Sequence, residues 1–164
     1  MQYKIFVSYS THDIEQVELL RQQLKGTPID VFIAEHSVLP SEDLGQTISS
    51  AIEECDLFVV LWSQNAHNSG WVSQEIGRAG ALNKTILPLV LTEGLSLPGF
   101  INNLKYIPVY HDPERAVITA RELIANSYNN KAHMLAKAEE KKQKDKEALA
   151  LMGIGAFVLW AFSK

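Results

Sequence analysis

Short apolar runs alternate with polar and amphipathic segments along the first 128 residues of the chain. Runs of this length that are rich in β-branched and aromatic residues predict buried β-strands. The five runs are Tyr3–Tyr9, Ile29–Ala34, Leu57–Trp62, Thr85–Leu91 and Tyr106–Tyr110. The run Leu57–Trp62 is apolar at every position, so we expect it to be central in a sheet that is covered on both faces. Pro88 lacks a backbone donor, which places the fourth strand near an edge.

Segments with apolar residues three or four positions apart lie between these runs and predict helices. Ser10 and Asp13 form the pattern of a helix N-terminus, with a hydroxyl at the cap and an acid three residues later. The polar stretch Ser63–Ser69 is expected to be a loop that leads into a helix at Trp71. The apolar stripe of the second helix consists of Leu44, Ile48, Ile52 and Cys55.

Strands that alternate with helices through short loops predict a parallel sheet, because parallel neighbours need crossover connections. The expected fold class is therefore α/β, with a flavodoxin-like five-stranded parallel sheet, helices on both faces and an added C-terminal hydrophobic helix. Ligands of such sheets bind beyond the carboxyl ends of the strands. The segments at that edge are Ser8–Asp13, Ala34–Asp43, Ser63–Glu75 and the chain from Thr92 onward.

Composition limits the classes of function. The chain has 164 residues, of which 46% are apolar and 21% charged, enough for one compact domain and a modest appendage. The net charge of −4 and the lack of a dense basic block before residue 130 argue against a nucleic-acid partner. No apolar segment precedes the first strand, so a secretory signal is not expected and the domain should be cytoplasmic.

The single cysteine, Cys55, excludes an internal disulfide and a cysteine-based metal cluster, and its apolar surroundings predict a buried, unreactive thiol. His12, His36 and His67 fall on predicted loops, but they show no paired spacing that would indicate a metal site. We therefore expect no metal.

Three motifs in order resemble the Toll/interleukin-1 receptor (TIR) domain family. The first, Phe6–Ser10 followed by Asp13, resembles the first conserved box of these domains. Val31–Ile33 resembles their second strand, and Ser69–Glu75 is similar to the Ser-x-Trp-x-x-x-Glu motif that opens their third helix. The resemblance covers Tyr3 to about Ser127, so residues 1–128 are expected to form the TIR domain. The loop after the second strand departs from the family pattern, with Ala34 and Pro40-Ser41 in place of an Asp and a Pro-Gly pair.

The resemblance implies two classes of function. Many TIR domains cleave the nicotinamide–ribose bond of NAD+ by hydrolysis or cyclisation, whereas others are assembly modules without catalysis. In the first class Glu75 is the catalytic carboxylate, NAD+ is a substrate and no further cofactor is expected. The chemistry suits the residue, because a carboxylate close to the sugar stabilises the oxocarbenium charge that develops as a glycosidic bond breaks. An immune-type signalling enzyme activated by self-association is the expectation, and a TIR–TIR scaffold is the alternative.

Five further residues are candidates for substrate binding, and three of them have a structural alternative. Ser10 fits a helix cap, Phe32 fits the core, and Trp71 fits a packing or positioning role. A solvated ion pair with Arg78, three residues on, is the alternative for the proposed catalytic Glu75. The candidates are Ser8, Tyr9, Ser10, Phe32 and Trp71.

The C-terminal tail is a separate feature. Residues 129–147 are rich in charged helix formers and predict a helical linker, and residues 148–164 contain the uncharged block Ala148–Phe162. A helix over this block is roughly 22 Å long, shorter than the roughly 30 Å hydrocarbon core of a bilayer, although flanking lysines extend its reach. Two interpretations remain: a tail anchor at the cytoplasmic face of a membrane, or an oligomerisation helix buried in a bundle. Both bring copies of the domain together.

Overall fold

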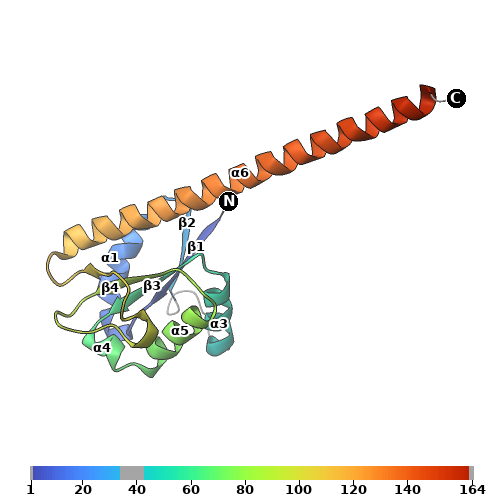
Figure 1. Ribbon diagram of the computed structural model, residues 1–164. Coiled ribbons are helices and arrows are strands. Elements are labelled where there is room, and N and C mark those ends of the chain that lie inside the picture. The colour runs from blue at the N-terminus through green and yellow to red at the C-terminus, as the bar shows by residue number, and fades with distance from the viewer. Residues whose placement is uncertain (1, 34–42, 163–164) are drawn as a thin grey trace. The chain divides into compact units, whose positions relative to one another are not determined.

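The computed structural model describes residues 2–33 and 43–162, and of residues 100 and 150–162 it describes only the backbone (Figure 1). Strands and helices alternate along the chain, as the hydrophobic pattern predicts. The strands are β1 (Tyr3–Ser8), β2 (Ile29–Phe32), β3 (Leu57–Trp62), β4 (Ile86–Val90) and β5 (Ile107–Pro108). The helices are α1 (Ile14–Leu24), α3 (Leu44–Glu54), α4 (Gln64–His67), α5 (Gly70–Ala81) and α6 (Pro113–Phe162), with 3-10 turns η1 (Thr11–Asp13) and η2 (Gly99–Ile101).

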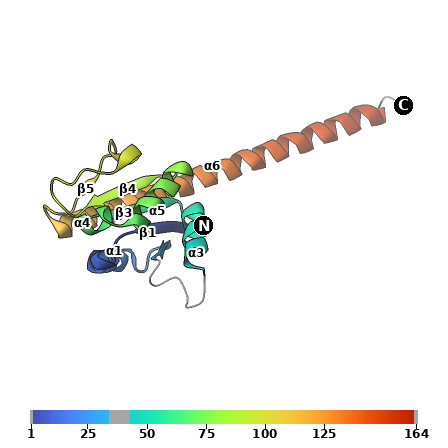
Figure 2. The same cartoon turned by 90° about the horizontal axis from the view of Figure 1, so that it is seen from below.

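The strands form one parallel sheet in the order β2-β1-β3-β4-β5, which is the flavodoxin-like order. Figure 2 shows β1, β3 and β4 running side by side. Every residue of β3 is buried, which confirms its predicted central place. Pro88 pairs with Val60 of β3, and the short edge strand β5 joins β4 only at Leu89 and Val90. Pro88 therefore lies one residue before the part of β4 that pairs with β5. As predicted, β4 is near an edge of the sheet, since only β5 lies beyond it.

Alternate side chains of the sheet face two layers of helices. Phe6 stacks between Phe32 and Phe58, with ring centroids 5.4 Å apart in both pairs. This aromatic row belongs to a core that also contains Ile52 of α3 and Ile76 of α5. The opposite face carries Leu61 and Leu89, which meet Leu20 of α1 and Val117 in the first turns of α6 around a small apolar cavity. Helices thus cover both faces, as the fold class requires.

Side-chain caps fix where most of these helices begin. A carboxylate or hydroxyl one residue before each helix accepts a hydrogen bond from a backbone N–H in the first turn, which satisfies a donor without an intrahelical partner. The capping residues are Asp43 for α3, Ser63 for α4, Ser69 for α5 and Asp112 for α6. Asp112 is followed by Pro113, and an acid at the cap with a proline in the first turn is favoured at the start of a helix.

Two sequence expectations are wrong at the edge of the sheet where the strands have their carboxyl ends. Ser10 does not cap a helix through its side chain; the chain turns through η1 first, and no cap hydrogen bond to the Ser10 hydroxyl forms. The stretch Ser63–Ser69 is not a plain loop, because Ser63 caps the single-turn helix α4, in which Ala66 is fully buried. The cap and the burial of Ala66 stabilise this turn, although the polar composition of the segment is typical of a loop.

The chain divides into two compact units, Met1–Ala125 and Asn126–Lys164. The described part of the second unit, residues 126–162, belongs to α6, and its described side chains include an exposed Glu140–Lys144 ion pair, with nitrogen and oxygen 2.7 Å apart. The predicted C-terminal helix is present, but the side chains of residues 150–162 and the end of the tail lie outside the described part. Within the described residues, no helix combines the length and apolar content needed to cross a bilayer. The loop residues Ala34, His36, Pro40 and Ser41 also lie outside the described ranges.

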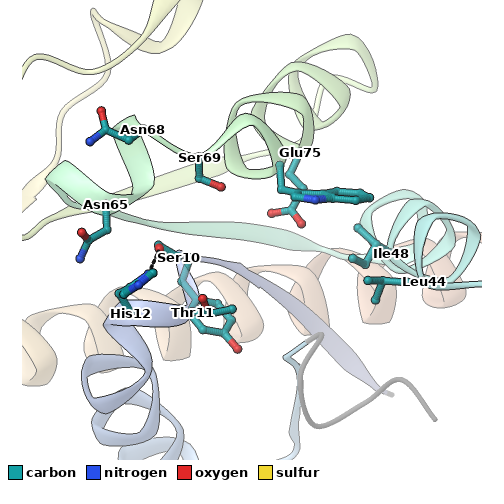
Figure 3. A pocket seen from close by; sticks show the side chains of 11 residues that line it. Ser10, Thr11, His12, Leu44, Ile48, Asn65, Asn68, Ser69 and Glu75 are labelled. Carbon is teal, nitrogen blue, oxygen red and sulfur yellow. Dashed lines mark hydrogen bonds between the residues drawn. The ribbon is translucent and has the colours of Figure 1, made fainter. Parts of the chain in front are cut away.

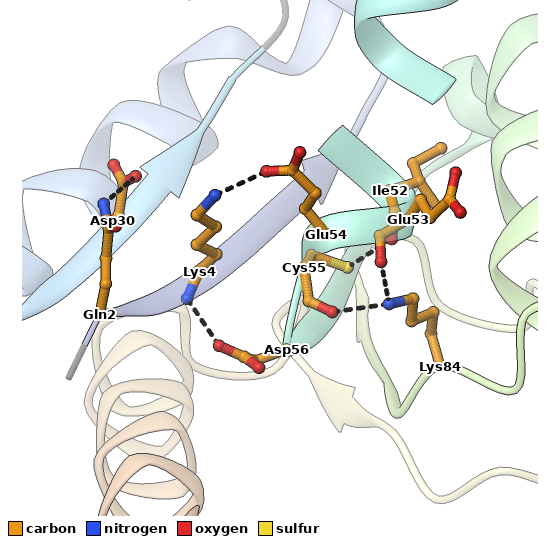
Figure 4. A network of polar contacts seen from close by, with 9 residues as sticks. All are labelled: Gln2, Lys4, Asp30, Ile52, Glu53, Glu54, Cys55, Asp56 and Lys84. Carbon is orange, nitrogen blue, oxygen red and sulfur yellow. Dashed lines mark hydrogen bonds and ion pairs between the residues drawn. The ribbon is translucent and has the colours of Figure 1, made fainter. Parts of the chain in front are cut away.

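A polar network joins the C-terminus of α3 to the amino ends of the strands, at the opposite edge of the sheet from the strands' carboxyl ends (Figure 4). The Lys84 ammonium donates to the backbone carbonyls of Glu53 and Cys55, at 2.5 and 2.9 Å. Lys4 forms an ion pair with Glu54, with Nζ and Oε2 2.6 Å apart. Cys55 is buried and unpaired with any other cysteine, and burial raises the pKa of its thiol, as expected for an unreactive side chain.

Replacing Lys84 by methionine should lower the free energy of unfolding by about 1–2 kcal/mol, because two carbonyls at a helix C-terminus lose a cationic donor. Urea denaturation followed by circular dichroism measures the change. Lys4→Met is the matched comparison. It removes the ammonium that pairs with the exposed carboxylate of Glu54, so it should lower the free energy of unfolding by less than Lys84→Met does. An equal or larger loss for Lys4→Met would contradict this assignment.

Candidate active site

A cavity of about 600 Å³ opens beyond the carboxyl ends of β1 and β3 (Figure 3). The chain leaves β1 toward η1 and α1, and leaves β3 toward α4 and α5, so the two connections diverge at this point. Such a switch point is where open parallel sheets bind ligands, and the volume is typical of small-molecule sites. The described lining residues are Tyr9, Ser10, Thr11, His12, Leu44, Ile48, Asn65, Asn68, Ser69, Trp71 and Glu75.

Glu75 lies in the second turn of α5, whose start is fixed by the Ser69 cap. Its side chain is half-buried, and its carboxylate points into the cavity (Figure 3). The hydroxyl of Ser8, at the end of β1, donates to Glu75 Oε2 at 2.5 Å. Ser8 is only 1% exposed, so it lies behind the carboxylate rather than on the cavity surface.

The environment of Glu75 changes its acidity. Burial raises the pKa of its carboxyl from the ordinary 4.5 to about 7, while the Ser8 hydrogen bond acts in the opposite direction. Burial dominates because the charged form loses more hydration than one donor restores. A carboxyl that titrates near neutral pH inside a cavity is a strong candidate for a functional group.

An apolar wall lies beside Glu75. Trp71 precedes it by one helical turn and lines the same cavity, yet its side chain is 56% exposed. The packing role suggested for Trp71 is therefore wrong, whereas the positioning role stays a prediction, and the indole is accessible to a ligand. Leu44 and Ile48 of α3 complete this apolar wall (Figure 3). Leu44 is 44% exposed, although the helical pattern placed it on the apolar stripe of its helix.

The opposite wall is polar, and a buried carboxylate orders it. Asp13, which is 7% exposed, accepts hydrogen bonds from Ser63 Oγ at 2.5 Å and from Asn65 Nδ2 at 3.0 Å. This connection joins η1 to α4 and fixes the amide of Asn65 at the cavity edge. Ser10 Oγ and His12 Nδ1 lie 3.4 Å apart on the same wall (Figure 3).

The structure brings most of the predicted site residues together. Tyr9, Ser10, Trp71 and Glu75 line the cavity, and Ser8 contacts it only through Glu75. Phe32 is not among the described lining residues; it is half-buried, and its ring stacks on Phe6 against the core. Seven described lining residues are not among the predicted site residues. Two come from α3, where no sequence signal marked a site, and the other five fall within the segments Ser8–Asp13 and Ser63–Glu75 that the carboxyl-end rule placed at this edge. They are Leu44 and Ile48 of α3, and Thr11, His12, Asn65, Asn68 and Ser69.

The alternative reading of Glu75 as half of a solvated helical ion pair is wrong. Arg78 instead approaches Glu53 of α3, with Nη2 and Oε2 4.0 Å apart. The described partner of the Glu75 carboxylate is the Ser8 hydroxyl. Among the described residues, no three His, Cys, Asp or Glu side chains are placed to hold a metal ion.

The TIR domain family matches residues 5–124, which is most of the chain and includes every described residue of the cavity. The chain belongs to the TIR domain family. This confirms the family inferred from the three motifs. No curated protein matches the chain.

Solved structures support the same fold. The TIR domain of the Toll-related receptor TRR-2 from Hydra magnipapillata is similar with a TM-score of 0.64 and 20% identity, over 77% of this TIR chain and 99% of that one. A prokaryotic SEFIR domain is similar with a TM-score of 0.57 and 18% identity, over 75% of this chain and 92% of that one. The TIR domains of the activated Roq1 resistosome, which recognises the effector XopQ, are similar with a TM-score of 0.51 and 20% identity. The match covers 78% of this chain and 84% of that one.

Replacing Glu75 by glutamine should make the stability of the protein less dependent on pH. In the wild type the folded pKa of about 7 exceeds the ordinary 4.5, so stability contributed by the protonated form is lost as pH rises through this window. Glutamine does not titrate. The stability of Glu75→Gln relative to wild type should therefore rise between pH 5 and 8, by about 3 kcal/mol at most.

Chemical denaturation at a series of pH values measures this difference. A stability difference between the two proteins that stays constant from pH 5 to 8 would show that Glu75 titrates normally.

Proposed function

We propose that this TIR domain cleaves the nicotinamide–ribose bond of NAD+, with Glu75 as the catalytic carboxylate. The observation that carries the proposal is a half-buried carboxylate beside an exposed indole, at the switch point of the sheet. Membership of the TIR domain family supports this class of reaction, and the site offers groups that suit it.

The bond to nicotinamide breaks toward a neutral leaving group, because the pyridinium takes the bonding electrons and loses its charge. Little acid assistance is therefore required, and the main requirement is stabilisation of the positive charge that develops on the ribose. An ionised Glu75 meets this requirement, either directly or by accepting a hydrogen bond from a ribose hydroxyl. Water or a second nucleophile within the substrate then completes hydrolysis or cyclisation.

The walls of the cavity suit the two parts of such a substrate. The indole of Trp71 and the side chains of Leu44 and Ile48 offer a surface for a flat, cationic pyridinium ring. The opposite wall, with Ser10, Asn65 and other polar groups, offers hydrogen bonds to hydroxyl groups. Partial burial also strengthens the attraction between the bound cation and the Glu75 carboxylate.

We further propose that assembly through the TIR domain and the C-terminal helix controls turnover in immune-type signalling. α6 continues along the chain after Ala125, where the first compact unit ends, and a long helical segment of this kind can bring several copies together. The alternative class is a TIR–TIR interaction module without catalysis. The two classes differ in whether a clustered protein consumes NAD+.

Glu75→Gln should reduce nicotinamide release from NAD+ by at least about 100-fold, because glutamine cannot stabilise developing positive charge as a carboxylate does. The measurement is product analysis by mass spectrometry, at a protein concentration high enough to favour self-association. Glu53→Gln is the matched control, since its side chain is exposed on α3 and does not line the cavity.

Full activity in Glu75→Gln would disprove the assignment of the catalytic residue. If clustered wild-type protein leaves NAD+ intact but binds other TIR domains, the interaction module is the correct function.

The pH dependence of the reaction should follow the protonation state of Glu75. Burial raises the pKa of this carboxyl to about 7, so the free protein holds the inactive protonated form below that pH. The value of kcat/KM should therefore rise with pH through about 7 and level off above it. A profile that instead falls through about 7 would indicate that Glu75 donates a proton.

A further inference from the structure

We propose that Ser8 is a positioning residue: its buried hydroxyl holds one carboxylate oxygen of Glu75 in place and leaves the other for the ligand in the cavity. The inference rests on the proposed function for the ligand, but the interaction itself belongs to the free protein. It assigns to Ser8 a role different from direct substrate binding.

The position of Ser8 excludes it from the cavity surface. Its side chain is 1% exposed, and it is not among the described lining residues, whereas its chain neighbours Tyr9 and Ser10 are. Its hydroxyl hydrogen is already donated to Glu75 Oε2 at 2.5 Å. A ligand in the cavity therefore meets Glu75 before it can meet Ser8.

The backbone around Ser8 is rigid enough to serve as a reference point. β1 lies between β2 and β3 in the sheet, and Ser8 is in register with Val60, a fully buried residue of the central strand. Glu75 in contrast has a long side chain with several rotatable bonds. A hydrogen bond from a fixed strand end removes that freedom before the substrate binds, which is how supporting residues preorganise a site.

The same contact favours the ionised form of Glu75. Ser8 lowers the pKa of the carboxyl against the larger, opposite effect of burial. The other titratable groups of the cavity, among the described residues, are Tyr9 at the end of β1 and His12 of η1. Arg78 of α5 is directed to Glu53 and does not neutralise Glu75.

The direct test is the titration of Glu75 in the absence of NAD+. Carbon-13 NMR of labelled glutamate carboxyl groups follows the signal that disappears in Glu75→Gln. Its midpoint should lie near 7 in the wild type and move upward by about one pH unit in Ser8→Ala. Ser8→Thr, which retains the hydroxyl, should keep the wild-type midpoint. An unchanged midpoint in Ser8→Ala would overturn the proposal.

Kinetics supply the second test. Ser8→Ala should shift the acid limb of the kcat/KM profile to higher pH and lower the plateau of kcat by about tenfold, with a smaller change in KM. Ser73→Ala is the matched control, because it removes an exposed hydroxyl from α5, the helix of Glu75, and the described hydrogen bond of that hydroxyl goes to the backbone carbonyl of Ser69. A variant that loses stability but keeps the wild-type profile would show a merely structural role.

The two tests separate this inference from the proposed function. If no protein form consumes NAD+ but the NMR midpoint moves in Ser8→Ala, the positioning role stands and the proposed reaction is wrong. If NAD+ is consumed with an identical pH profile in Ser8→Ala, the reaction stands and the positioning role is wrong.

Discussion

The site depends on the contact between a carboxylate removed from water and one buried hydroxyl. Glu75 loses hydration when α5 packs against the end of β1, and Ser8 restores only part of it. The cost of this burial is tolerated because the rest of the helix is secured by apolar packing, with Val72 and Ile76 buried on the same core as Phe6. A stable core therefore holds a functional group in a state that it would not adopt in water.

The arrangement of strands determines where this contact can form. β1 and β3 are neighbours in the sheet although α1, β2 and α3 lie between them along the chain, so Ser8 and Glu75, which are 67 positions apart, meet. Asp13 performs a parallel task on the other wall, since it joins η1 to α4 through Ser63 and Asn65. The first contact joins the end of β1, and the second the connection after β1, to the segment that follows β3. The cavity is thus held on each side by a hydrogen-bonded carboxylate.

The likeness to solved TIR and SEFIR domains establishes the architecture of the chain, while the side chains at the switch point carry the argument about chemistry. Those structures share about a fifth of their residues with this chain, which is enough to preserve a sheet and its helices. The exposed indole of Trp71, the half-buried Glu75 and the apolar wall of α3 are features of this chain. They give the proposed reaction its physical basis.

The sequence by itself determined the fold class, the family, the central place of β3 and the position of Glu75 in the helix after β3, because period, strand length and motif order are local properties of the chain. Only the tertiary structure decided which side chains are open. It exposed Trp71 and Leu44, packed the half-buried Phe32 against the core, and put Ser8 behind Glu75 rather than against a ligand. It also replaced the expected Ser10 cap by η1. Burial and hydrogen-bond partners depend on elements distant in the sequence, and no local pattern specifies them.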